Sequence, residues 1–162
     1  MHKARCQTDL TPRTHRSCAE VVRTHAAAFA ASQSLAPTLA YGEMPTQAGL
    51  HIMDMSEEDE LETFTGLAAS GAQLMLHHVG AAPAPGHPMV PLVQVSGDSQ
   101  VGEQFAGDLD ASLSPTDDVN AQVESLRSLI ERVAGGDYQL QTSAPQVTVG
   151  FQLSRGPLGI SL

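Results

Sequence analysis

The chain of 162 residues has a formal net charge of −10, and 41% of its residues are hydrophobic although only 4% are aromatic. This length and hydrophobic content suffice for one folded domain with an aliphatic core, and they exclude disorder over the whole chain. The acidity argues against partners that present phosphate backbones, so no nucleic-acid binding is expected. No membrane is expected either, because no run approaches the ~18 apolar residues of a membrane span.

The charge is unevenly distributed along the chain. Residues 1–26 hold five lysines and arginines against two acids, whereas the remaining residues hold three arginines against sixteen acids. Cys6 and Cys18 match no zinc-binding spacing and no disulfide scaffold, so reduced thiols and a cytoplasmic location are expected. The basic N-terminus lacks the apolar core of a secretory signal, and a transit peptide is the less favoured alternative.

Residues 1–35 are predicted to be an N-terminal extension that contains one amphipathic helix. Ser17 and Glu20 form a capping-box pattern, and apolar residues recur behind them at helical spacing, which predicts a helix over 17–32. The connector that follows is expected to contain a short strand over 38–41, and a second short strand is expected over 49–54.

The next predicted elements are a helix and two strands. Ser56 and Asp59 form a capping pattern, and Gly71 is the expected C′ residue, which predicts a helix between them. Two short apolar runs follow, over 73–79 and 91–95, and their bounding glycines and prolines are typical of buried parallel strands. The loop between the runs leaves the carboxyl end of the first strand, where open α/β sheets place ligands.

The remaining part of the chain is expected to hold a short helix over 99–106, a short strand over 108–111 and one long helix. Ser114 as cap, Pro115 at the first helical position and Asp117 at the third predict the start of that long helix. Its apolar stripe consists of Val119, Val123, Leu126, Ile130 and Val133, and Gly135-Gly136 is expected to end it. Two closing strands are predicted over 146–153 and 158–161.

The alternation of strands and helices predicts the α/β class. We expect a three-layer, Rossmann-like, mostly parallel sheet of about 4–5 strands with flanking helices over residues 36–162. A sheet this small leaves an edge strand exposed, which favours pairing or dimerisation.

Two upstream motifs resemble the C-terminal region of the altronate/galactarate dehydratase family, the sugar-acid hydro-lyases. Tyr41 to Asp54 (YGEMPTQAGLHIMD) resembles the family's YxERPTxxGLYFMD. Gly66 to Gln73 resembles GxAAxGAQ, the segment before an apolar strand in that family.

Further motifs with the same resemblance lie downstream, in order and with the right spacing, so that it covers roughly residues 36–162. Asp108 to Ala111 resembles D-I/M-D-x-N-A-G, Arg132 to Gly136 resembles RVASG, and Gly159 to Leu162 resembles G-V-T-L. The family's glycine- and proline-rich loop is matched without a gap by Gly80, Gly86, Pro88 and Pro91.

The resemblance implies a domain of a dehydratase that removes water from altronate- or galactarate-like acids. It implies a small acidic sugar as substrate and iron(II) or another divalent metal as cofactor. The family's upstream motif, similar to G-Y-x-R-x-D-G-R-x-G-x-R-N, is not found. The chain is therefore expected to be incomplete by itself, with a second chain or a homodimer supplying the rest. A non-catalytic remnant or interaction module and a small-anion-binding module are the alternatives.

The resemblance also gives candidate substrate-binding residues, although it identifies no catalytic residue. Gly80, Gly86 and His87 lie in the loop and are the expected substrate-binding residues; the alternative is a crossover loop without a ligand. The family's Gly-Arg-Gly-Thr corresponds here to residues 80–83, Gly-Ala-Ala-Pro. The positive charge of the loop is therefore lower than in the family, and its backbone is less able to approach a ligand closely.

Asp108, Asp110 and His78 are the expected metal ligands. Asp108 and Asp110 fall on the family's D-x-D motif, and residues two apart on a strand share one face, where they could hold a divalent cation or a sugar hydroxyl. His77 and His78 point to opposite faces, so only one of them can face a site. Alternatively, the two aspartates cap a helix or stabilise a turn, and the histidines are packed in the core or exposed to solvent.

Overall fold

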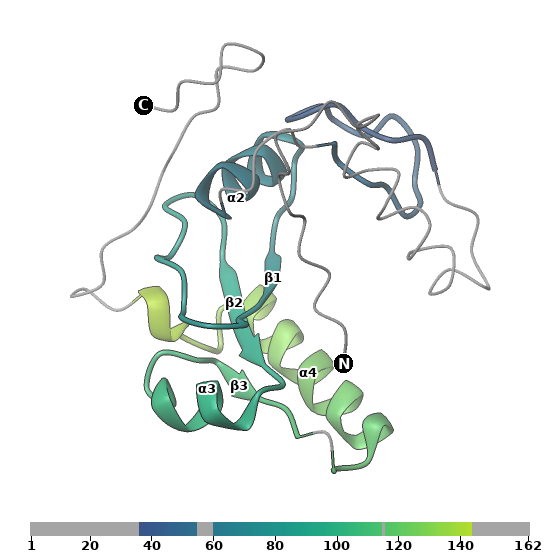
Figure 1. The fold of residues 1–162 in the computed structure, drawn as a ribbon. Coiled ribbons are helices and arrows are strands. Elements are labelled where there is room, and N and C mark those ends of the chain that lie inside the picture. The colour runs from purple at the N-terminus through teal and green to yellow at the C-terminus, as the bar shows by residue number, and fades with distance from the viewer. Residues whose placement is uncertain (1–35, 55–59, 115, 144–162) are drawn as a thin grey trace, which may run out of the picture.

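The computed structural model describes residues 36–54, 60–114 and 116–143, and a sheet of three parallel strands lies at its centre (Figure 1). The strands are β1 (Met75–His78), β2 (Leu92–Ser96) and β3 (Ala111–Ser112), in the spatial order β1-β2-β3. The α/β class and the parallel strands predicted within 73–79 and 91–95 are confirmed. The larger, Rossmann-like sheet of about 4–5 strands stays a prediction.

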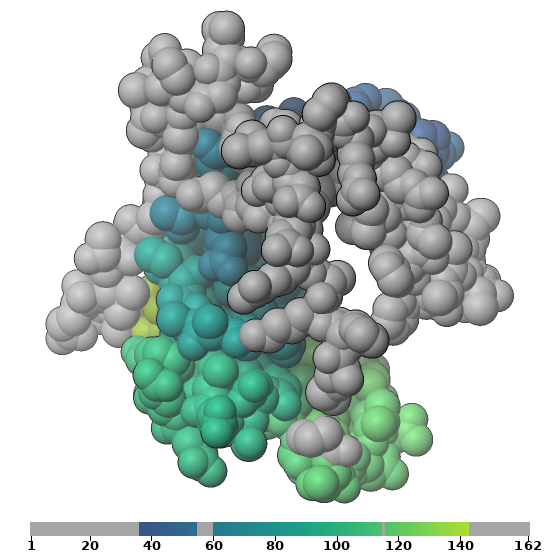
Figure 2. All heavy atoms as spheres, viewed as in Figure 1, coloured from purple at the N-terminus to yellow at the C-terminus, as the bar shows by residue number. Residues whose placement is uncertain are grey.

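Four helical segments accompany the sheet in the described ranges. They are α2 (Glu60–Ala69), α3 (Ser99–Gln104), α4 (Val119–Gly135) and a 3-10 turn, η1 (Gln141–Ser143). In the space-filling view, α3 and α4 form the lower part of the visible face, with α3 on the left and α4 on the right (Figure 2). Among the described residues, none of the helices has both the length and the apolar character needed to cross a bilayer.

β2 is the centre of the core, because all five of its residues are buried. Successive side chains of a strand point to opposite faces of the sheet. Leu92 accordingly packs with Phe64 of α2, whereas Val93 packs with Leu129 of α4. The two longer helices thus cover opposite faces of the sheet, and β2 contributes to both clusters.

α4 begins later than the sequence predicts. Its cap is Asp118, whose Oδ1 accepts hydrogen bonds from the amides of Asn120 (2.7 Å) and Ala121 (3.1 Å). The predicted cap at Ser114 is wrong: the Oγ of Ser114 lies 2.7 Å from Thr116 Oγ1 in the turn before the helix. A carboxylate satisfies the first helical amides and also suits the positive end of the helix dipole.

The end of α4 follows the prediction, but its apolar stripe is buried only in part. Gly136 adopts the left-handed conformation (φ 78°) and terminates the helix. Leu129 and Val133 are buried against the sheet, whereas Val119 and Val123 are 70% and 55% exposed. The first two turns of α4 therefore extend beyond the part of the helix that packs on the strands.

Residues 36–54 pack on α2 rather than joining the central sheet. The strands predicted over 38–41 and 49–54 are reduced to one parallel β-bridge between Leu39 and Met53. Tyr41 Oη donates to the carbonyl of Glu62 at 2.9 Å, and its ring lies where a Cβ of Gly66 would have to be. The glycine at position 66 is therefore required for this close contact.

The other predicted elements are found with shorter bounds or lie outside the described residues. The helix before Gly71 is observed as α2, and Gly71 follows it with φ 91°. The helix expected over 99–106 is α3. The strand expected over 108–111 is displaced, because β3 consists of Ala111 and Ser112 and residues 108–110 precede it. Outside the described residues lie the helix over 17–32, the Ser56 and Asp59 cap, Pro115 and the strands over 146–153 and 158–161.

Candidate functional site

The glycine- and proline-rich loop between β1 and β2 is tied to the sheet by side chains of β2. Gln94 is fully buried, and its Oε1 accepts from the amide of Ala84 at 2.7 Å while its Nε2 donates to the carbonyl of Ala84 at 2.9 Å. The Oγ of Ser96 donates to the carbonyl of Val79 at 2.9 Å. The loop thus has two fixed points although it contains no helix or strand.

His77 connects this loop anchor to α2. Its Nδ1 lies 3.2 Å from Oε1 of Gln94, its ring packs edge-on against Phe64, and its Nε2 lies 3.6 Å from Oε1 of Glu60. Because the Gln94 oxygen can only accept, Nδ1 of His77 is the donor in this contact. The neighbouring His78 lies apart from this network, where its Nε2 accepts from the amide of Gly97 at 3.3 Å.

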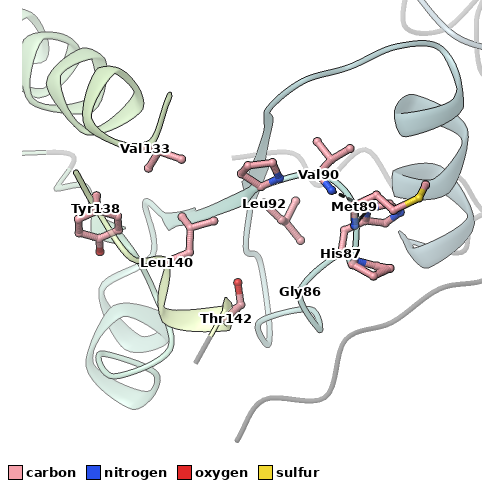
Figure 3. A pocket seen from close by; sticks show the side chains of 11 residues that line it. Gly86, His87, Met89, Val90, Leu92, Val133, Tyr138, Leu140 and Thr142 are labelled. Carbon is pink, nitrogen blue, oxygen red and sulfur yellow. Dashed lines mark hydrogen bonds between the residues drawn. The ribbon is translucent and has the colours of Figure 1, made fainter. Parts of the chain in front are cut away.

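A cavity of about 420 Å³ lies at the amino end of β2, and we call it the amino-end cavity (Figure 3). The end of the loop, the last turn of α4 and the segment before η1 form its walls. Leu92, Val133 and Leu140 give it an apolar side, and the side chains of Tyr138 and Thr142 add hydroxyl groups. The sequence placed the ligand at the carboxyl end of β1, whereas this cavity lies at the opposite edge, because residues 86–91 lead into β2.

A second cavity of about 300 Å³ is lined by the preceding residues of the same loop, and we call it the loop cavity. Its walls are formed by loop residues 82–85 together with Phe105, Asp108, Gln141 and Thr142. Thr142 is the residue that both cavities share. One loop and one turn therefore shape both cavities.

Two of the three predicted substrate-binding residues line the amino-end cavity. A Cβ on Gly86 would lie 2.7 Å from the carbonyl oxygen of Thr142, so only glycine allows this approach. A Cβ on Gly80 would meet nothing within 4 Å, and Gly80 lines neither cavity. The structure thus brings Gly86 and His87 together and leaves Gly80 apart.

His87 is buried, and its ring has a defined protonation state. Its Nδ1 accepts from the amides of Met89 (3.3 Å) and Val90 (3.2 Å), which places the proton of the neutral ring on Nε2. Burial lowers the pKa of His87 below its ordinary value of 6.5. Burial therefore favours the neutral form of His87 in the cavity.

The three predicted metal ligands do not form a cluster. Asp110 uses both carboxylate oxygens on backbone amides, with Oδ2 accepting from Gln94 (2.8 Å) and Oδ1 from Gln141 (3.0 Å). Asp108 is exposed and lines the loop cavity, and His78 contacts Gly97. Within the described ranges, no three His, Cys, Asp or Glu side chains are grouped so that they could hold a metal ion. The described residues thus do not fit a divalent-metal site, and the metal ligands stay a prediction.

The sequence reasoning overlooked several residues that shape the two cavities. Gln94 is the one polar side chain between Leu92 and Val95, and a polar residue inside a buried strand signals a hydrogen-bonding partner. Tyr138 and Thr142 follow the last helix in a segment without periodicity, so no pattern pointed to them. Arg132 lies with its Cζ 5.0 Å from the centroid of the Tyr138 ring.

A family model described as D-galactarate/altronate dehydratase, C-terminal, matches residues 25–149, which is more than half of the chain. The match includes every residue that lines the two cavities and begins upstream of residue 36, the predicted domain boundary, which stays a prediction. No curated protein matches the chain.

Proposed function

The chain belongs to the D-galactarate/altronate dehydratase family through the C-terminal region of that family, and on this basis we propose that it forms part of the active site of a sugar-acid hydro-lyase. The substrates would be small polyhydroxy acids of the altronate or galactarate type. The cytoplasm is the proposed location, from the cysteine content. The observation that carries the proposal is the family match. The matched residues include the loop that Gln94 anchors and that lines both cavities.

The cavities suit a molecule with several hydroxyl groups. Their volumes of about 420 and 300 Å³ are those of sites for small molecules. Tyr138 and Thr142 offer hydroxyl groups to the amino-end cavity, and Asp108 offers a carboxylate to the loop cavity. The two hydroxyl groups can donate to and accept from the hydroxyls of a sugar acid, and the carboxylate can accept from them.

The reaction sets requirements that the described residues meet only in part. A base removes the proton from the carbon beside the carboxylate, the C–O bond at the neighbouring carbon breaks, and the hydroxyl leaves with a proton as water. The negative charge that develops on the carboxylate must be stabilised by a cation or metal. Among the described residues, no lysine or arginine lines either cavity. No three metal-ligating side chains of these residues are grouped so that they could hold a metal ion.

Because the described residues supply no such cation or metal site, we expect further residues to complete the active site. We propose that a second polypeptide carrying the family's upstream half supplies them, with a second copy of this chain as the alternative source. The iron(II) or other divalent metal expected from the resemblance would then have its ligands beyond the described residues. The homodimer and the two-chain assembly differ in mass, so light scattering on the purified sample distinguishes them.

Binding of a small acid without turnover is the second candidate function. The observation that favours it is that Asp110, one of the predicted metal ligands, has both oxygens engaged by backbone amides while the cavities remain. In this case the fold and the cavities are kept and the reaction is absent.

The test is turnover of a panel of aldarates and aldonates, with iron(II), in the presence and absence of the polypeptide that carries the upstream half. We expect loss of one water, detected by mass spectrometry, only when both chains are present. The matched controls are each chain alone and the mixture with a chelator. Binding of an acid in the calorimeter without product from any acid in the panel would leave the second candidate.

A further inference from the structure

We infer that the loop cavity binds an organic cation, a guanidinium or primary ammonium group, and that the carboxylate of Asp108 anchors it. This goes beyond the proposed function, because such a ligand carries the charge opposite to that of a sugar acid. The cationic group belongs either to a free small molecule or to an arginine or lysine side chain of another polypeptide, and its chemistry is the same in both cases.

The side chains of the cavity wall make the loop cavity negative. Asp108 lines the cavity, and it is the one side chain with a formal charge among the described residues of that wall. A second carboxylate lies directly behind the wall, because Oδ1 of Asp110 accepts at 3.0 Å from the amide of Gln141, which lines the cavity. Since no lysine or arginine is among these lining residues, the local field attracts cations and repels anions.

The loop backbone in this wall lacks donors for an anion. Pro83 and Pro85 have no amide N–H, and the amide of Ala84 between them donates at 2.7 Å to Oε1 of the buried Gln94. Anion sites in loops are built from successive backbone N–H groups that point at the ligand. No N–H of residues 83–85 is therefore available to an anion in the loop cavity.

The remaining wall suits an organic cation better than a metal ion. A planar guanidinium binds both oxygens of one carboxylate, so Asp108 alone is a sufficient partner. Phe105 adds an aromatic ring, whose face attracts a cation, and the two prolines provide an apolar surface for an alkyl chain. A metal ion needs several ligands, and no three ligating side chains of the described residues are grouped so that they could hold one.

The position of the loop cavity connects this inference to the proposed reaction. Thr142 lines both cavities, so a cation held by Asp108 lies in the compartment next to the amino-end cavity. The proposed reaction needs a positive charge near the carboxylate of its substrate. This connection rests on the proposed function, whereas the cation site itself does not.

The test is titration of the full chain with ethylguanidinium chloride at constant ionic strength, followed through the amide NMR signals of Phe105, Asp108 and Gln141. We expect these signals to shift in a saturable way. Ethylurea has the same shape without the charge, and it should bind at least about fivefold more weakly because the charge-assisted hydrogen bonds are lost.

Two variants that lose the same charge distinguish the cavity from the general field of the protein. Asp108→Asn removes the anchor and should weaken ethylguanidinium binding at least about fivefold. Glu103→Gln removes an exposed carboxylate of α3 that lines neither cavity, and it should leave binding within about twofold.

A third variant tests the ring and does not depend on the folding of Asp108→Asn. Phe105→Leu keeps an apolar side chain, and it should weaken ethylguanidinium binding about twofold or more while the binding of ethylurea stays the same. Circular dichroism checks the fold of each variant, and Phe105→Leu takes the place of Asp108→Asn if the latter is unfolded.

Competition identifies the source of the cation. The polypeptide that carries the family's upstream half is titrated into the chain in the calorimeter, with and without saturating ethylguanidinium. Weaker binding in the presence of ethylguanidinium, together with weaker binding by Asp108→Asn, assigns the cation to a side chain of that polypeptide. Unchanged binding in both experiments assigns it to a free small molecule.

Four results would overturn the inference. The first is no saturation by about 50 mM ethylguanidinium, an affinity too low for a specific site. The others are equal binding of ethylurea, equal weakening by Asp108→Asn and Glu103→Gln, and tighter binding of MgCl₂ than of ethylguanidinium at the same signals. Turnover is measured in none of these titrations, so the proposed function and the cation site can each fail without the other.

Discussion

The side chains of Gln94 and Asp110 form hydrogen bonds with the backbone of other segments. Together they connect the loop, β2, the segment before β3 and η1. Gln94 holds Ala84 of the loop, and Asp110 holds the amides of Gln94 and Gln141. Leaving a buried backbone donor or acceptor without its partner costs about 1–3 kcal/mol. The walls of both cavities are therefore fixed by the same short chain of hydrogen bonds.

Gly86 provides a test of that close packing. The variant Gly86→Ala places a methyl group against the carbonyl of Thr142, where the distance would be 2.7 Å, and should lower the free energy of unfolding by about 1–3 kcal/mol. Urea unfolding followed by circular dichroism measures the change. Gly80→Ala is the matched control in the same loop and should be nearly neutral, since its Cβ meets nothing within 4 Å. Equal effects of the two variants would contradict the packing argument.

The pKa values of two histidines should be shifted in opposite directions from the ordinary value. Burial lowers the pKa of His87 below 6.5, whereas the backbone carbonyls of Gln47 and Pro37, which both accept from the charged ring, raise the pKa of His51 above 6.5. The contribution of His87 to stability is complete above pH 6.5 and is lost as the pH falls through its folded-state pKa. The contribution of His51 is complete below pH 6.5 and is lost as the pH rises through its folded-state pKa.

NMR titration of the imidazole C–H signals measures both values directly. The variants His87→Asn and His51→Asn assign the signals, and the asparagine oxygen at position 87 can still accept from the amides of Met89 and Val90. A pKa of His87 at or above that of His51 would contradict the structure.

At the scale of elements, α4 combines a well-defined start and end with uneven packing. Its second half carries Leu129 and Val133 into the core beside β2, and its first half exposes Val119 and Val123. Burial of apolar surface stabilises a helix more than its intrinsic propensity does. The first turns of α4 depend correspondingly more on the cap at Asp118 than the last turns depend on Gly136.

The position of that cap can be tested by two substitutions. Asp118→Ala removes the acceptor of the Asn120 and Ala121 amides and should cost about 1 kcal/mol of stability in urea unfolding. Ser114→Ala removes an exposed contact with the Thr116 hydroxyl and an exposed 3.3 Å hydrogen bond from the Thr116 amide, and it should stay within about 0.5 kcal/mol. A larger loss at position 114 than at position 118 would move the helix start back to Ser114.

At the scale of the whole molecule, the excess of acidic residues should reduce stability at low salt. The chain has 18 acids against 8 lysines and arginines, and the two ion pairs of Arg127 are exposed. Exposed pairs contribute little, so repulsion among the acids dominates the electrostatic free energy. Raising NaCl from about 0.05 to 0.3 M shortens the screening length and should raise the Tm in calorimetry.

KCl at the same ionic strength is the control for this salt effect. It should give the same increase in Tm as NaCl, because screening depends on ionic strength and not on which monovalent cation is present. A falling Tm in both salts would show that attractive ion pairs outweigh the repulsion.

The central strands and the end of α4 were predictable from sequence because their signals are local. Runs of apolar residues bounded by glycine and proline marked β1 and β2, and Gly135-Gly136 marked the helix end. Asp118 was missed because Ser114, with Pro115 behind it, offers a competing local cap. The roles of Asp110 and Thr142 depend on segments about 30 and 55 residues away in the chain, Gln141 and Gly86 respectively. Such long-range partners leave no local pattern.

Thr142 has a consequence for the range of molecules that could be accommodated. Its side chain is buried at the border of the two cavities, and its carbonyl contacts the loop at Gly86. Because Thr142 is part of the wall of both cavities, replacing it with glycine should enlarge both of them at once. The side chain at this one position therefore limits the room for a guest in two neighbouring spaces.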